Sequence, residues 1–145
     1  MKITAKGKVA RFIRMAEGDP INGYSVDGAT GKRYFLNTGA LILADLASLI
    51  GPILGQYEIR KNPAGPAVSG DVILHADHLY VCFSQDSNAE WGFYWRTCDS
   101  RTDYEGHKNR WMPWSALENR GQVAEEMRKT IDDVIPDIER RKDGQ

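Results

Sequence analysis

The segment Ile21–Leu41 reads INGYSVDGATGKRYFLNTGAL and combines turn-forming residues with residues typical of β-strands. Its centre, residues 27–32, combines an aspartate with two glycines, a composition typical of tight turns because glycine takes positive φ without strain. On either side, residues 24–26 and 33–37 show the period of two that favours β-strands. We therefore predict two strands joined by a turn and followed by the start of a helix.

Length and composition restrict the class of protein. The chain has 145 residues, of which 27% are charged and 41% hydrophobic. These are ordinary values for a globular protein, so disordered, collagen-like and membrane classes are excluded. The net charge of −1 conceals an uneven distribution, because residues 1–76 hold nine Lys/Arg and six Asp/Glu, whereas residues 77–145 hold ten and fourteen. The first half is therefore basic and the second half acidic.

Several features predict a cytoplasmic protein without a membrane segment. The N-terminal residues, MKITAKGKVARFIRM, scatter charges through the region where a signal peptide needs an apolar core. The longest apolar run, Ala40–Gly55, contains Asp45 and Pro52 and is shorter than a membrane span. The two cysteines, Cys82 and Cys98, lack the spacing of a metal site and are expected to be free thiols.

Residues 2–15 carry five basic residues and no acidic one, interleaved with apolar residues, so we predict a strand with a positive outer face. Such a face can bind phosphate groups, since Lys and Arg release counterions from a polyanion. The alternative is a solvated sheet edge that its lysines protect against pairing with another chain.

The remaining elements of the first half complete a predicted barrel. Residues 40–50 have the spacing of a helix, and Gly51-Pro52 ends it. Residues 57–61 and 67–74 read as a fourth and a fifth strand. Three strands, a helix and two further strands within some 75 residues give the order of a small OB-type barrel.

Five short stretches carry a resemblance to a known family: KGKVARF at 6–12, NGY at 22–24, YFLNTGAL at 34–41, GQYEI at 55–59 and GPAV at 65–68. In this order they resemble the cold-shock domain over about half of the chain. The resemblance implies a five-stranded barrel that binds single-stranded RNA or DNA by stacking bases on aromatic residues of strands 1–3. The chain departs from the family's pattern at several positions: Arg11 replaces a surface Trp, Asn37 a His and Thr38 a second aromatic residue. In strand 2 it keeps only Tyr24 of two aromatic residues, the other position being Asn22 or Val26.

The resemblance and the basic segment together predict a nucleic-acid-binding surface. Tyr24 and Phe35 are the aromatic residues kept from the stacking platform, and Arg11 and Arg33 can stack on bases or bind phosphate. The alternative is that both aromatic residues cover the barrel wall or contact the second half of the chain. The predicted nucleic-acid-binding residues are Lys6, Lys8, Arg11, Arg14, Tyr24, Arg33, Phe35 and Asn37.

The second half predicts a β-hairpin followed by a helix. Residues 78–84 and 90–98 alternate around a polar turn, and their apolar side carries Trp91, Phe93 and Trp95, which we interpret as core. After the polar loop at 99–109, a helix is expected to begin near residues 119–121, because apolar residues then recur every three or four positions. Pro136 is expected to kink or restart this helix, and residues 139–145 to fray.

Residues 110–114 of the second half, RWMPW, place two tryptophans beside a proline and an arginine. They are either a protein-interaction surface formed by Arg110, Trp111 and Trp114, or a segment that packs under the last helix. Neither His75, Asp77 and His78 nor Cys98, Asp99, Asp103 and His107 forms a recognised catalytic or metal-binding pattern. We therefore predict no enzymatic activity, no cofactor and no metal.

The sequence thus predicts an α+β, mainly β protein: a five-stranded OB-type barrel at 1–76, followed at 77–145 by a β-hairpin and a C-terminal amphipathic α-helix packed on the barrel. Two functions remain open. One is single-stranded RNA or DNA binding of the OB or cold-shock type. The other is a non-catalytic protein-interaction module, an adaptor or inhibitor, that binds a protein partner through the barrel and the acidic, Trp-rich second half.

Overall fold

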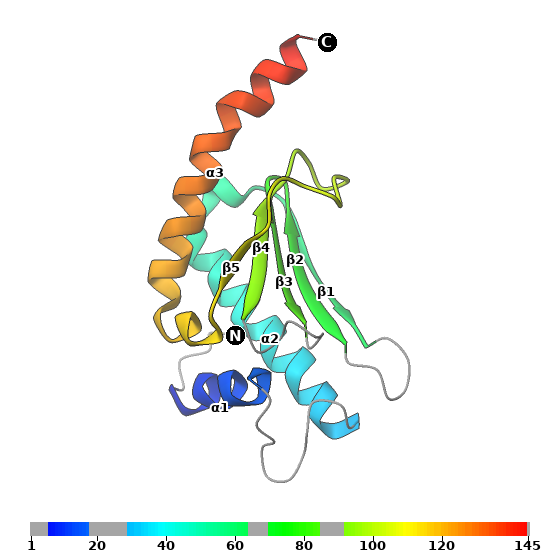
Figure 1. The fold of residues 1–145 in the computed structure, drawn as a ribbon, viewed down its shortest axis with the longest axis vertical. Coiled ribbons are helices and arrows are strands. Elements are labelled where there is room, and N and C mark those ends of the chain that lie inside the picture. Colours follow the sequence, from blue (N-terminus) through cyan, green and yellow to red (C-terminus); the bar gives the residue numbers. More distant parts are fainter. Residues whose placement is uncertain (1–5, 18–28, 64–69, 85–91, 145) are drawn as a thin grey trace.

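The computed structural model describes residues 6–17, 29–63, 70–84 and 92–144, which form an α+β fold with helices on one face of an antiparallel sheet (Figure 1). The α-helices are α1 (Lys6–Ala16), α2 (Ala29–Ile50) and α3 (Arg120–Asp143). Two short 3-10 helices are η1 (Pro52–Leu54) and η3 (Trp114–Asn119). The strands are β1 (Tyr57–Asn62), β2 (Asp71–Ala76), β3 (Leu79–Ser84), β4 (Phe93–Thr97) and β5 (Arg110–Met112).

The five strands pair in sequence order, β1-β2-β3-β4-β5, and every pairing is antiparallel. An α+β fold with a five-stranded antiparallel sheet and a C-terminal helix is confirmed, but β3, β4 and β5 come from the second half of the chain and not from residues 1–76. The predicted closure into a barrel is not confirmed, because the strands in the described part form an open sheet with β1 and β5 at its edges. Residue 76, at which the first unit was predicted to end, is the last residue of β2, and both halves of the chain contribute strands to one sheet.

The strands predicted at 2–15 and 33–37 are wrong, because residues 6–16 and 29–50 are α-helical. In α1 the buried residues Val9, Phe12, Ile13 and Ala16 follow the i, i+3, i+4, i+7 spacing of one helix face. Residues 24–26, the other predicted strand of this hairpin, lie outside the described residues. The α-helices span 11, 22 and 24 residues, more than the strands together, so the fold is less β-rich than expected.

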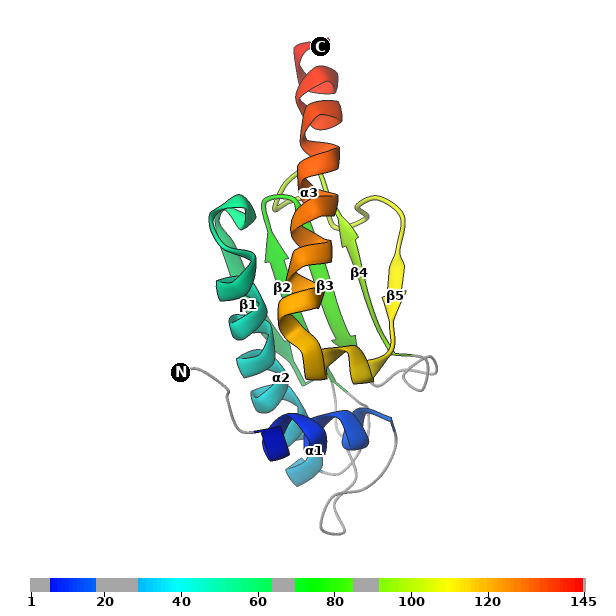
Figure 2. The same ribbon diagram turned by 90° about the vertical axis from the view of Figure 1, so that its left-hand side faces the viewer.

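The core lies between the sheet and the helices. Figure 2 shows α2 and α3 in front of one sheet face, with α1 near one end. This inner face presents alternating residues of the central strands, including Leu74, Val81, Phe83 and Trp95, all at most 1% exposed. Burying one such side chain stabilises a fold by about 1.5–3 kcal/mol. The predicted core stripe is thereby confirmed for Phe93 and Trp95, while Trp91 lies outside the described residues.

The last helix is confirmed and longer than predicted. Its N-cap is Asn119, whose side chain accepts a hydrogen bond from the Gln122 backbone N–H. It continues as one helix past Pro136 to Asp143, so Pro136 does not restart the helix, and residues 139–143, which were expected to fray, are helical. An ion pair between Arg120 Nε and the buried Asp45 Oδ2, 2.7 Å apart, joins the start of α3 to α2. Among the described residues, no helix combines the length and apolarity needed to cross a membrane.

Candidate functional site

Among the residues predicted to bind nucleic acid, the aromatic residue that the structure describes, Phe35, is buried. Phe35 is 0% exposed and stacks on Phe12, with ring centroids 5.0 Å apart, so its ring faces are not available to bases. Asn37 is exposed and accepts a hydrogen bond from Lys61 Nζ at 3.1 Å. Tyr24 lies outside the described residues, and Lys6 is the first residue of α1. The remaining predicted residues are cationic and lie on helices: Lys8, Arg11, Arg14 and Arg33.

The two tryptophans of the segment 110–114 differ in exposure, so one fits the predicted interaction surface and the other fits packing in the core. Arg110, Trp111 and Met112 form β5, and the Trp111 side chain is 46% exposed. Trp114 begins η3, is 1% exposed and packs edge-on against Phe12, Phe35 and Phe83. Trp111 is therefore a surface residue, and Trp114 belongs to the core.

The sheet face opposite the helices, which we call the outer face, carries a row of contacting rings. Cross-strand register places His75 beside Tyr80, Tyr80 beside Arg96, and Tyr94 beside Trp111. Side chains of paired residues project from the same face of a sheet. The ring centroids are 5.1 Å apart for His75–Tyr80, 6.5 Å for Tyr80–Tyr94 and 5.4 Å for Tyr94–Trp111. Tyr104, from the loop after β4, completes this outer row, with its ring 5.3 Å from that of His75.

Two arginines lie against the outer row. The Arg96 guanidinium carbon is 4.0 Å from the Tyr80 ring centroid, and that of Arg60 is 5.6 Å from the Tyr104 centroid. Both distances are within the range of cation–π attraction. Arg60 also pairs with Glu58 at 3.4 Å, and Arg101 reaches the same carboxylate at 3.7 Å. The outer face therefore combines exposed aromatic surface with charges of both signs.

Arg96 also fixes the loop 98–109 against the sheet. It is buried, and its guanidinium donates to Asn109 Oδ1 at 3.1 Å and to the Tyr104 carbonyl. Hydrogen bonds to a charged donor are among the stronger ones in proteins. This anchoring holds the exposed Tyr104 ring over the end of the outer row.

Hydrogen bonds within the loop give it a defined shape. His107 bridges Thr97 Oγ1 at 2.7 Å and Asp99 Oδ1 at 2.8 Å. The hydrogen bond from His107 is the largest cause that lowers the pKa of Asp99 below its usual value. The backbone N–H groups of Asp99 and Gly106 donate to Asp103 and lower the pKa of its carboxyl. Both carboxylates stabilise the loop in their charged form.

Asp99, Asp103 and His107 are also the described residues that come closest to a metal site, with one ligand atom of each within 4.8 Å of the others. Their atoms are already used in the loop: Asp99 Oδ1 accepts from His107 and Arg141, and both Asp103 oxygens accept backbone N–H groups. A cation would have to replace these hydrogen bonds. We interpret the cluster as part of the loop structure.

Burial changes the pKa values of three groups of the sheet and the loop that follows it, Cys98, His75 and Tyr94. Burial raises the pKa of the Cys98 thiol to about 12, so it is not a thiolate nucleophile near neutral pH. Burial also lowers the pKa of His75, which is 1% exposed and has no hydrogen-bond partner for Nδ1 among the described residues. Burial likewise raises the pKa of Tyr94, so its phenol stays neutral.

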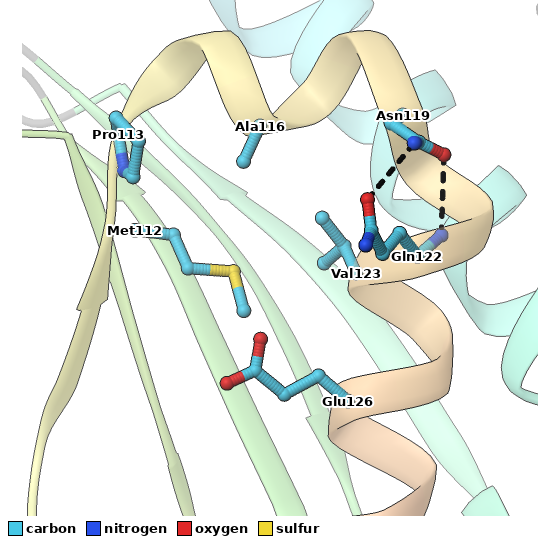
Figure 3. A pocket seen from close by; sticks show the side chains of 7 residues that line it. All are labelled: Met112, Pro113, Ala116, Asn119, Gln122, Val123 and Glu126. Atoms are coloured by element: carbon cyan, nitrogen blue, oxygen red, sulfur yellow. Dashed lines mark hydrogen bonds between the residues drawn. The ribbon is translucent and has the colours of Figure 1, made fainter.

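A second surface feature is a groove beside the edge strand β5. Its volume is about 240 Å³, and Figure 3 shows it between the end of β5, η3 and the first turns of α3. The Met112 thioether and the Glu126 carboxylate face each other across it (Figure 3). The other lining residues are Pro113, Ala116, Asn119, Gln122 and Val123.

Comparisons with known proteins give no assignment: no protein-family model matches the chain, no curated protein is similar to it, and no solved structure matches its fold. The candidate sites are therefore interpreted from their own chemistry.

The sequence interpretation missed the outer row, although part of its signal was present. Tyr94 and Arg96 occupy the alternate positions of a strand whose other side was predicted to be core. A large aromatic residue on the side of a strand opposite the core can indicate a second packed surface. The place of Tyr104 in the outer row could not be predicted from strand alternation, because Tyr104 belongs to a polar loop that folds back onto the sheet.

Proposed function

We propose that the protein is a non-catalytic protein-interaction module whose outer face binds a protein partner. The observation that carries the proposal is the outer row, in which Trp111 is 46% and Tyr104 56% exposed above buried supporting residues. The cytoplasmic location expected from the sequence is part of this proposal.

The residue types of the outer row favour a protein partner. Trp, Tyr and Arg are the residues that most often dominate protein–protein binding energy, because they combine large apolar area with polar groups. Tyr94 lies between the buried Tyr80 and the exposed Trp111, so the exposed rings are held on a rigid sheet. A surface held in its binding conformation loses less entropy on association.

The same features argue against base stacking as the main function. A stacking platform needs aromatic faces open to solvent beside cationic groups that follow a phosphate backbone. On the outer face, Arg96 covers one side of Tyr80, and the acidic Glu58 lies beside Arg60 and Arg101. Phe35, which the cold-shock resemblance places in the platform, is buried.

The proposal can be tested with a photo-crosslinking amino acid placed at position 111 or at position 57. Tyr57 is a matched control, because it is 45% exposed but belongs to the edge strand β1, away from the outer row. In lysate of the source organism, crosslinking from position 111 to one defined protein is expected, and none from position 57. With that protein purified, Trp111→Ala should weaken binding by at least about 30-fold, the loss typical of a hot-spot residue.

Two results would contradict the proposal. One is equal crosslinking from positions 57 and 111. The other is wild-type affinity of both Trp111→Ala and Tyr104→Ala for every protein that is captured.

A second candidate function rests on the cationic face of α1. Lys8, Arg11 and Arg14 are exposed at intervals of three residues, and α1 contains no acidic residue. Such a row can bind the phosphates of single-stranded RNA or DNA, with an affinity that falls steeply as salt is added. This candidate keeps the nucleic-acid function implied by the cold-shock resemblance, but it uses cationic residues of a helix in place of a stacking platform.

Fluorescence titration with oligo(dT) and oligo(U) at low salt tests the second candidate. Binding that weakens with salt, and that is lost in the double variant Arg11→Glu/Arg14→Glu but kept in Trp111→Ala, is expected if α1 is the site. The absence of binding at high micromolar protein would exclude it.

A further inference from the structure

The edge strand β5 offers backbone groups for pairing with another strand. It pairs with β4 on one side, and no described strand lies on its other side. Free edges are templates for strand addition, and proteins commonly protect them with charged residues. β1, at the opposite edge, has this protection in Glu58, Arg60 and Lys61. β5 is Arg-Trp-Met; it carries a single charge, and its three residues offer a short edge.

The groove beside β5 ends in an acidic group without an ionic partner. Met112 and Val123 are buried and give it an apolar floor, while Glu126 lies on its rim and is exposed. No ion pair of the Glu126 carboxylate is found within the described ranges. The groove therefore fits a side chain with an apolar stem and a cationic end, since such a stem packs on apolar surface while its charge stays accessible.

Arg110 on the same strand has these properties. Its guanidinium carbon lies 5.6 Å from the ring centroid of Trp95, an inner-face residue, so the side chain is on the helix side of β5, like Met112. Arg110 is exposed, and the described part of the chain supplies it with no carboxylate partner. One edge of the molecule thus carries both an unpaired cation and an unpaired carboxylate.

We propose that the β5 edges of two copies pair antiparallel about a two-fold axis at Trp111. In this register Arg110 lies opposite the partner's Met112, because positions that are equally far from the axis in opposite directions face each other. The Arg110 side chain then lies at the partner's groove, close to the partner's Glu126. The two-fold symmetry repeats this contact, so each dimer contains two such ion pairs.

The same register places the two Trp111 side chains next to each other on the outer face. Residues directly opposite each other on paired strands have Cβ atoms about 4.5–5.5 Å apart. The outer rows of two copies then form one continuous surface. The dimer does not depend on the proposed partner-binding function, because it uses the strand edge and the helix side of β5.

Charge reversal tests the pairing, with the mass in solution measured by sedimentation equilibrium. The full-length wild type is expected to dimerise at micromolar to high micromolar concentration. Arg110→Glu and Glu126→Arg should each raise the dimer dissociation constant at least about tenfold, since each places two like-charged pairs in the interface. The double variant Arg110→Glu/Glu126→Arg restores opposite charges and should recover the dimer. Arg11→Glu, on α1, changes the net charge equally and should have no effect.

A covalent trap gives an independent measurement. Trp111→Cys should form an intermolecular disulfide under mild oxidation, because the axis places the two Cα atoms within the range that a disulfide spans. Tyr57→Cys, at the opposite edge, should remain reduced. The native Cys82 and Cys98 are buried and should not interfere.

Three outcomes would overturn the proposal. One is a wild type that remains monomeric at high micromolar concentration and a Trp111→Cys variant that does not crosslink. A second is a dimer that the double charge reversal does not recover. A third is a monomer whose β5 edge binds only a strand of another protein, which would assign the edge to that partner.

Discussion

The rings of Phe12 and Phe35 are stacked, with centroids 5.0 Å apart and an interplanar angle of 17°. Phe12 belongs to α1 and Phe35 to α2, and both rings also contact Trp114 at the start of η3. The ring centroid of Phe83, on β3, lies 5.7 Å from that of Phe12. This aromatic cluster therefore joins the N-terminal helices to the sheet and to the connection that leads into α3.

Replacing Phe35 should reveal whether it is a core or a ligand-binding residue. Phe35→Ala is expected to lower the free energy of unfolding by about 3–5 kcal/mol, because a fully buried ring is lost and a cavity remains. Urea denaturation measures this. Arg33→Ala, at an exposed position of the same helix, should change stability by no more than about 0.5 kcal/mol. A Phe35→Ala protein as stable as the wild type would show that the cluster is not formed.

Arg96 is expected to control the order of the loop 98–109. Arg96→Ala removes the donors to Asn109 and to the Tyr104 carbonyl and should cost about 2–4 kcal/mol of stability, because hydrogen bonds to charged groups are lost inside the structure. Trypsin should then cleave faster after Arg101 and Lys108, the two cleavage sites within this loop. Arg60→Ala, which leaves the loop donors in place, should keep wild-type cleavage rates. Equal rates in both variants would contradict this role of Arg96.

The parts of the fold that local periodicity determines could be predicted. The strands predicted at 57–61, 78–84 and 90–98 overlap β1, β3 and β4, and the last helix begins at Arg120, within the predicted range 119–121. The N-terminal helices were missed because short apolar runs flanked by turn-forming residues fit both the helical period of 3.6 residues and the strand period of two. The helix predicted at residues 40–50 is only the second half of α2, which begins at Ala29, because packing against the sheet overrides local propensity.

The candidate site was harder to predict than the core. Tyr80, Tyr94 and Trp111 come from three strands, and only the cross-strand register brings their rings together. Register depends on long-range pairing, which a local pattern does not specify. The sequence therefore predicted Tyr24 and Phe35, which match a family pattern, as binding residues. It did not predict the side chains that the sheet brings together.

Gly39 provides a test of how closely α2 approaches the sheet. A Cβ atom built at this position would lie 2.8 Å from Val72 Cγ1 and 3.3 Å from Phe12 Cε1, closer than such atoms normally approach. Gly39→Ala should therefore lower stability by about 1–3 kcal/mol through overpacking, although alanine is the better helix former by about 1 kcal/mol. Thermal unfolding measures the change. Gly121→Ala, with open space around its Cβ position in α3, should be neutral or stabilising.

Stability should depend on pH through His75. Burial lowers its pKa in the folded protein below the usual value of 6.5, so the unfolded chain binds the proton more readily. The stabilisation from neutral His75 is therefore complete above about pH 6.5 and is lost as the pH falls below this value toward the folded-state pKa. Urea denaturation at pH 7.5 and pH 5.5 should show a lower free energy of unfolding at the acidic pH, and His75→Gln should reduce this difference. The variant His78→Gln is the control, since His78 lies in the turn between β2 and β3 and is more exposed. A pH dependence that His75→Gln leaves unchanged, or that His78→Gln removes, would show that another group is responsible.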